Sequence, residues 1–281
     1  MTPDFVVHWT FKPLLLAGLL GLAFVYGRAW RQLRRQGDES ALAFQPWFFG
    51  AGLAGMAVLT ASPLDDLGQR ALFIARMFEY ILLVYVLPSL IWMGIPARWP
   101  QRLAEHPQIQ KRLHWFNEIV IPSVGFNLIF LIWHLPPFFE LALRNPFFNQ
   151  LQLLLLLAVA CLMWLPLLCS YLPLRLTLPR QMFYLITLIF AQVPVFAMLT
   201  FSRQPLYLTY ITAPRVTQMH AFADQQLGGW MLKTVSAVIF AAAFIRIFLE
   251  WNRNSRQIDR DENATAFENF ELINRAEERK G

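Results

Sequence analysis

The chain has 281 residues, of which 57% are apolar and only 15% are charged. Soluble domains are usually about 45–50% apolar and about 25% charged, so this composition excludes an ordinary soluble protein. The net charge of +6 does not indicate nucleic acid, because the basic residues gather in short segments between apolar runs.

Seven apolar runs of the length that crosses the hydrocarbon core of a bilayer follow one another along the chain. They cover approximately residues 11–26, 44–61, 72–93, 118–133, 147–168, 182–201 and 228–248. A secretory signal peptide carries its positive charge before the apolar stretch, whereas here the arginines follow it, so we expect an uncleaved first helix. The sequence therefore predicts an all-α polytopic membrane protein, with a seven-helix bundle over residues 1–251.

The positions of Lys and Arg predict how the bundle is oriented. With the N-terminus outside, the outer segments hold four of them, Arg70, Arg144, Arg203 and Arg215. The inner segments hold sixteen, namely Arg28, Arg31, Arg34, Arg35, Arg98, Arg102, Lys111, Arg112, Arg175, Arg180, Arg253, Arg256, Arg260, Arg275, Arg279 and Lys280. Cytoplasmic loops carry the excess of basic residues, so we predict an outer N-terminus and a cytoplasmic C-terminus.

Two local patterns qualify this picture. Pro194 lies inside the sixth run and predicts a kink. Residues 252–281 form a polar tail, in which Thr265-Ala266-Phe267-Glu268 fits a capping box. This pattern predicts the start of a short amphipathic helix, and a frayed tail is the alternative.

Three of the ionisable residues inside the apolar runs could carry chemistry. Arg76 and Glu79 are three residues apart and therefore share a helix face. Charges at that depth should pair or face the bundle interior, so they form either a substrate or proton site or a structural ion pair, which we favour. Lys233 in the seventh run either joins the same network or extends to the outer surface.

The outer segments contain residues that bind metals in other proteins. His134 ends the fourth run beside Pro136, and Met219 and His220 precede the seventh. Imidazole and thioether groups suit copper, so a metal site at His134, Met219, His220 and Asp224 is one hypothesis. The alternatives are an interfacial histidine and an Asp224 that caps the seventh helix, with Gly228 and Gly229 allowing close helix approach. No motif of an enzyme is present, so we expect no catalytic activity.

The order of several short motifs resembles the CtaG family of bacterial cytochrome c oxidase assembly factors. The matching stretches are Phe11-Lys12-Pro13-Leu14, Ser62-Pro63-Leu64-Asp65, Trp133-His134-Leu135-Pro136-Pro137, Leu141-Ala142-Leu143-Arg144-Asn145-Pro146, Pro205-Leu206-Tyr207 and Asp224-Gln225-Gln226-Leu227-Gly228-Gly229. The resemblance implies a seven-helix protein of the bacterial cytoplasmic (inner) membrane. It also implies oxidase subunits as partners, and a role in maturing the copper centre of haem–copper oxidases from the outer face.

The chain departs from the family pattern where the third run begins. The family typically has Ala-His-Met-x-x-His there, whereas this chain has Arg76 and Tyr80 in place of the two histidines. Asn149 and Leu153 stand where histidines often begin the fifth run. Three hypotheses follow: an assembly factor that handles copper, a metal-free accessory subunit or scaffold of the oxidase, and a small transporter that uses Arg76, Glu79 and Lys233.

Overall fold

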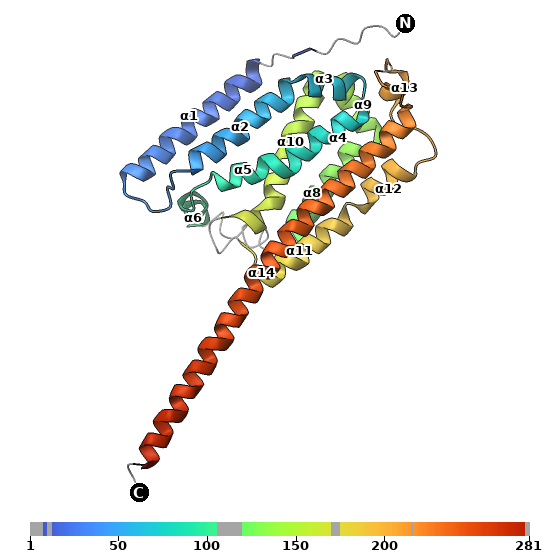
Figure 1. Cartoon of the computed structure of the whole chain (residues 1–281). Helices are drawn as coiled ribbons and strands as arrows, with labels where there is room; N and C mark the ends of the chain where they lie inside the picture. The colour runs from blue at the N-terminus through green and yellow to red at the C-terminus, as the bar shows by residue number, and fades with distance from the viewer. Residues whose placement is uncertain (1–7, 10–12, 106–119, 170–174, 215, 279–281) are drawn as a thin grey trace.

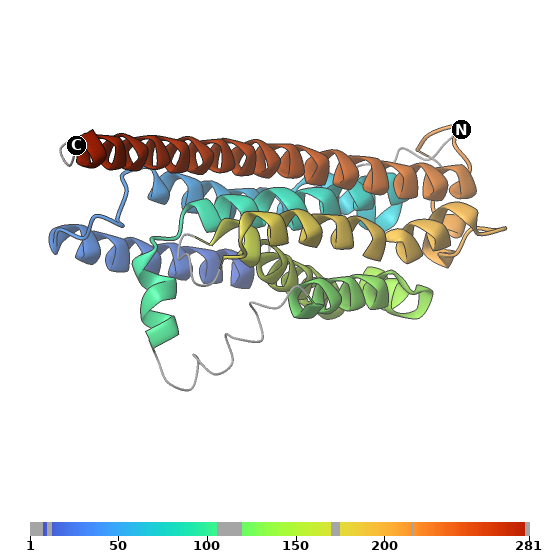
Figure 2. The same cartoon turned by 90° about the horizontal axis from the view of Figure 1, so that it is seen from below.

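A computed structural model describes residues 8–9, 13–105, 120–169, 175–214 and 216–278. Throughout these residues the regular structure is helical and no β-strand is formed, as the sequence predicted. The helices pack side by side in a bundle (Figures 1 and 2), and one long helix extends from it alone (Figure 1).

Several spans consist of consecutive helices joined end to end, as in Phe73–Met93 and Leu178–Phe201. The first half contains α1 (Pro13–Arg35), α2 (Gln45–Ala61), α3 (Pro63–Arg70), α4 (Phe73–Ile81), the π-helical turn η1 (Leu82–Val86), α5 (Leu87–Met93) and α6 (Arg98–Glu105). The second half contains α8 (Val120–His134), α9 (Pro136–Arg144), α10 (Pro146–Leu168), α11 (Leu178–Ala191), α12 (Val193–Phe201), α13 (Leu208–Thr212) and α14 (Ala221–Glu278).

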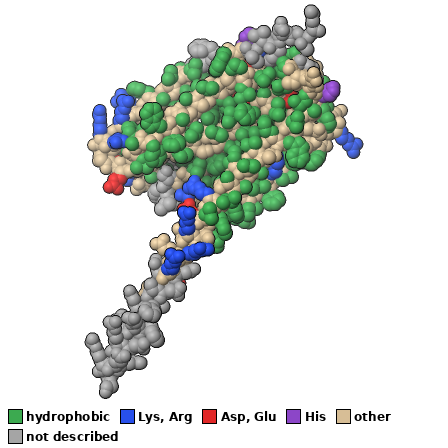
Figure 3. All heavy atoms as spheres, viewed as in Figure 1, with side chains coloured by type: hydrophobic (Ala, Val, Ile, Leu, Met, Phe, Trp, Pro, Cys, Tyr) green, Lys and Arg blue, Asp and Glu red, His purple; other side chains and the backbone are tan. Residues whose placement is uncertain are grey.

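Several of these helices are long and apolar enough to cross a membrane. Within the described residues, four stretches qualify, Phe73–Met93, Pro146–Leu168, Leu178–Phe201 and Ala221–Ile258. Two bent pairs, α2 with α3 at 47° and α8 with α9 at 69°, raise the number to six. Apolar side chains cover most of the face in Figure 3, as expected for a surface in lipid. The expected count of seven is not confirmed, since α1 is not among these spans.

Proline sets the joints at one end of the bundle. Ser62, Leu135 and Asn145 each precede a proline and have extended backbone, with ψ of 162°, 136° and 116°. The proline ring disfavours helical backbone in the residue before it, so each preceding helix ends there and a new one begins. The segments 135–146 and 202–227, which connect predicted apolar runs, are therefore partly helical: the first contains α9, and the second contains α13 and the start of α14.

The core lies where α14 packs along α4, α11 and α12, while α10 packs against α5, α8 and α9. In η1 the wider π turn redirects backbone carbonyls. The indole Nε1 of Trp164 donates a hydrogen bond of 2.9 Å to the carbonyl of Val84 in that turn. Helix α10 thereby holds the irregular centre of the α4–α5 span in place.

Two local expectations have different outcomes. The sixth run breaks as predicted, because α11 ends at Ala191 and α12 begins at Val193, next to Pro194. The tail differs from the expectation: Thr265 lies inside α14, which continues without interruption to Glu278. No glycine or proline occurs between Trp230 and Glu278, so nothing in that stretch stops the helix.

Candidate functional site

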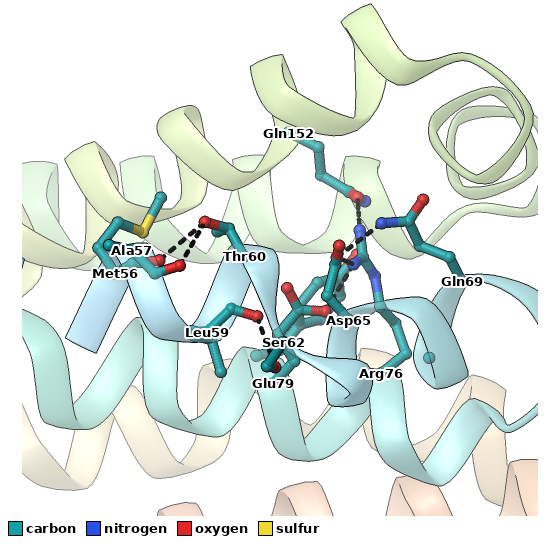
Figure 4. Close-up of polar contacts among 12 residues, drawn as sticks. Met56, Ala57, Leu59, Thr60, Ser62, Asp65, Gln69, Arg76, Glu79 and Gln152 are labelled. Carbon is teal, nitrogen blue, oxygen red and sulfur yellow. Dashed lines mark hydrogen bonds and ion pairs between the residues drawn. The ribbon is translucent and has the colours of Figure 1, made fainter. Parts of the chain in front are cut away.

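A buried charge cluster lies at the end of the bundle where α3 meets α4. The guanidinium of Arg76 is fully buried, and its Nη1 lies 2.5 Å from Oε2 of Glu79 and 3.3 Å from Oδ1 of Asp65. Its Nη2 donates to Oε1 of Gln152 on α10 at 3.1 Å. Figure 4 shows the carboxylate and amide groups converging on this side chain.

Tyr80 completes the surroundings of the guanidinium. Its hydroxyl accepts a hydrogen bond of 3.3 Å from Nε of Arg76, and its ring lies 5.0 Å from the guanidinium carbon. Gln69 donates to Oδ1 of Asp65 at 2.6 Å. The cluster therefore ties α3, α4 and α10 together through charge-assisted hydrogen bonds, which are stronger than neutral ones.

The sequence predicted the central pair of this cluster. Arg76 and Glu79 pair as expected for two residues on one helix face. Asp65 was visible only as part of the Ser-Pro-Leu-Asp motif, and Gln152 carried no sequence signal. Asn149 and Leu153, the two departures from the family pattern on α10, are buried on either side of Gln152.

His134 is the last residue of α8, and its side chain is fully buried in the bundle. Its Nδ1 lies 2.6 Å from the carbonyl of Phe130. A carbonyl oxygen only accepts, so we infer that Nδ1 carries the proton and that Nε2 is the unprotonated nitrogen. This Nε2 is buried without a hydrogen-bond partner in the described chain, among the rings of Tyr80 and Phe139.

Asp224 caps a helix, but not the one that was expected. Helix α14 begins at Ala221, so Asp224 lies inside its first turn. Its carboxylate accepts hydrogen bonds from the backbone N–H groups of Phe73 at 2.7 Å and Ile74 at 3.0 Å, which open α4. A sequence pattern points only to the helix that follows it, whereas this cap joins elements 150 residues apart in the chain.

The rest of the Asp-Gln-Gln motif also binds neighbouring segments. Gln225 donates to the carbonyl of Leu199 at 3.0 Å and accepts from the backbone N–H of Leu206 at 2.7 Å. Gln226 donates to the carbonyl of Thr200 at 2.9 Å. The motif is therefore a connector that fixes α14 to α12 and to the segment after it.

The two glycines of the motif permit close helix contact, as predicted. A Cβ on Gly228 would lie 2.6 Å from the ring of Phe73, and one on Gly229 would lie 2.9 Å from Oγ1 of Thr200. Neither distance leaves room for a side chain, so the spacing of α14 from α4 and α12 depends on these positions.

The four candidate metal ligands do not gather around one point. His220 is exposed and Met219 half-buried on the segment before α14. Both oxygens of Asp224 accept backbone hydrogen bonds, from Phe73 and Ile74, whereas the ring of His134 packs against that of Phe139. Within the residues that the structure describes, no group of three His, Cys, Asp or Glu side chains has the spacing of a metal site.

The residues around His134 do not fit a resident copper ion. Copper favours imidazole, thioether and thiolate ligands, whereas Nε2 of His134 is surrounded by aromatic rings. Tyr80 touches both His134 and Arg76, whose positive charge is compensated by the carboxylates of Asp65 and Glu79.

Lys233 lies apart from the charge cluster. Its ammonium donates a hydrogen bond of 2.6 Å to the carbonyl of Ile189, near the break between α11 and α12. Neither expected role holds in the described chain, since the ammonium is bound to a neighbouring helix and does not pair with Glu79 or extend to the outer surface.

Two of the motifs noted in the sequence, the one that contains His134 and the one that begins at Asp224, lie at the same end of the bundle. The hydroxyl of Tyr207 donates to the carbonyl of His134 at 2.7 Å, and the preceding residue, Leu206, is held by Gln225. The end of α8 and the start of α14 therefore meet through one connecting segment.

No curated protein and no solved structure matches the chain. The model of one protein family, described as cytochrome c oxidase caa3 assembly factor (Caa3_CtaG), matches residues 24–254. This range begins within α1, includes the charge cluster and the Asp-Gln-Gln connector, and ends within α14. The chain therefore belongs to the family of cytochrome c oxidase caa3 assembly factors.

Proposed function

We propose that the chain assists the assembly of a haem–copper cytochrome c oxidase from the outer face of the bacterial cytoplasmic membrane, as a non-catalytic partner of oxidase subunits. Family membership supports the assembly role. One structural observation supports the outer face as the working surface. Hydrogen bonds join α3, α4, α8, α10 and α14 at the end of the bundle that the topology below assigns to that face.

The proposed topology has seven spans, an outer N-terminus and a cytoplasmic C-terminus. The distribution of basic residues supports it. Contacts at the opposite end of the bundle agree: the hydroxyl of Tyr26 donates to the carbonyl of Gly94 at 2.7 Å, and Arg98 lies 3.9 Å from Asp38. These contacts join three segments that the topology assigns to the cytoplasmic side.

We propose that the chain acts while the copper centre of the oxidase matures. In this step it binds the oxidase subunit and does not bind the copper ion. Arg76 supports this form of the proposal, because its guanidinium binds the nearby carboxylates of Asp65 and Glu79. The transporter alternative gains no support, since Arg76 and Glu79 are fully buried and bound to each other.

Two measurements on the full-length protein test this proposal. After purification from membranes exposed to Cu(I), metal analysis should find less than one copper per chain, and newly made oxidase subunits should purify with it. If the wild-type chain binds one copper ion and the His134→Phe variant binds none, the hypothesis of an assembly factor that handles copper would be favoured. Absence of oxidase subunits under conditions in which the oxidase is being made would contradict the proposed partner.

A further inference from the structure

Lys233 is a charged residue placed deep within a membrane-spanning helix. It follows Ala221, the first residue of α14, by 12 positions, which is about 18 Å along the helix axis. It lies seven residues, or about 10 Å, beyond Gln226, the last residue of the polar connector. Its ammonium does not reach back to that connector, because it binds the carbonyl of Ile189.

This carbonyl satisfies only part of the ammonium. Ile189 lies in the last turn of α11, where backbone carbonyls lack a partner within the helix, so one function of Lys233 is to satisfy this carbonyl. An ammonium has three N–H donors and a full charge, and a neutral carbonyl does not compensate the charge. No carboxylate within the described part of the chain lies at ion-pair distance from Lys233.

A small groove opens beside this ammonium. Lys233, Gln192, Phe196 and Leu232 are among its lining residues, and its volume is about 10 Å³, which is roughly the space of one water molecule. The groove therefore presents the positive charge of the ammonium between apolar walls, and this charge is complementary to a carboxylate.

The surface around the groove faces outward from the bundle. Phe190 is 70% exposed and Trp230, one turn before Lys233 on the same face of α14, is 51% exposed. These side chains lie on apolar spans, so their surroundings are lipid tails or another transmembrane helix. An intramembrane cation with no paired carboxylate marks a functional position on such a surface.

We propose that Lys233 docks a transmembrane helix of a partner protein that carries an Asp or Glu side chain in its apolar span. Resting on the proposed function, we assign this helix to an oxidase subunit. Lipid head groups lie at the membrane surface, about 10 Å or more from Lys233, so a carboxylate at this depth has to be carried by a side chain of a membrane-spanning helix. A second copy of this chain offers no equivalent group at this depth, because Glu79 is fully buried, Asp224 is bound to the start of α4, and Glu250 lies 17 residues beyond Lys233 (250 − 233) on α14.

The test is photo-crosslinking of the full-length protein in native membranes. The probe is p-benzoyl-phenylalanine introduced at position 230, whose indole ring packs 5.0 Å from that of Phe196 beside the groove. The same probe at Val238, which is 62% exposed two turns further along α14, serves as the matched control. Adducts are identified by mass spectrometry in the wild type, Lys233→Met and Lys233→Arg backgrounds.

The expected adduct joins position 230 to an acidic transmembrane helix of an oxidase subunit. Its yield should fall by about tenfold or more in Lys233→Met and remain in Lys233→Arg, because removing one member of a buried charge pair weakens binding strongly. Exchanging the charges, with Lys233→Glu here and lysine in place of the partner's carboxylate, should restore the adduct. The exchange does not restore the hydrogen bond to Ile189, so recovery of the adduct would show that the charge pair with the partner, and not that hydrogen bond, is required.

Adducts with lipid or a second copy alone, or a yield unchanged by Lys233→Met, would overturn the docking inference. An adduct with an acidic helix of a protein outside the oxidase would support docking by Lys233 and count against the proposed function. The two proposals therefore fail in distinguishable ways.

Discussion

Replacing Arg76 by methionine should destabilise the protein more than any change of a surface arginine. Arg76→Met keeps an unbranched side chain but leaves Asp65 and Glu79 as buried carboxylates without their shared cation. Removing one partner of a buried ion pair typically costs about 3–5 kcal/mol. The loss should be near the upper end of this range, because Gln152 also loses its donor.

A triple variant isolates the charge from the packing. In Arg76→Met with Asp65→Asn and Glu79→Gln, no charge remains in the cluster, so most of the lost stability should return. The surface control is Arg144→Met, which removes an exposed ion pair with Glu140 of 3.0 Å that is worth about 0.2–1 kcal/mol.

The assay is unfolding of purified protein in detergent micelles with increasing dodecyl sulfate, followed by circular dichroism. The expected order of stability is wild type, Arg144→Met close to it, the triple variant, and Arg76→Met far below. The explanation based on unpaired buried charge would be refuted by Arg76→Met unfolding together with the wild type, or by a triple variant no more stable than the single one.

Two further substitutions test how α14 is attached, with the same unfolding assay. Asp224→Ala removes the cap of α4 and should cost about 1–2 kcal/mol, whereas Asp224→Asn, which keeps an acceptor oxygen, should lose less; equal losses would argue against capping. Gly228→Ala places a methyl group 2.6 Å from the ring of Phe73 and should cost about 1–3 kcal/mol. Gly125→Ala, with nothing within 4 Å, is the matched control, and it should not lower stability.

Apolar runs predicted where most helices lie, because a span of hydrocarbon needs a continuous apolar stretch and its ends need polar residues. The predicted runs 72–93 and 147–168 agree within a residue with the stretches Phe73–Met93 and Pro146–Leu168. Composition did not reveal the short helices α3, α9 and α13. These lie in polar or proline-rich segments whose helical turns depend on contacts with the bundle, such as the 2.9 Å hydrogen bond from the backbone N–H of Thr209 to Glu140.

The site was less predictable because its contacts connect distant parts of the chain. The spacing of Arg76 and Glu79 was sufficient to pair them, since both lie on one helix. Gln152 reaches the guanidinium of Arg76 only because α10 packs beside α4, and no local sequence pattern encodes that packing. The same limit explains Asp224, whose local sequence favours a cap on its own helix while its carboxylate binds the start of α4.

The most direct test of the proposed function is the amount of complete, copper-loaded oxidase in membranes of a strain that lacks this chain. Haem spectra, copper content and oxidase activity should all be reduced, and the wild-type chain supplied from a plasmid should restore them. The Lys233→Met chain should restore them only in part. Full amounts of active, copper-loaded oxidase without the chain would contradict its role in assembly.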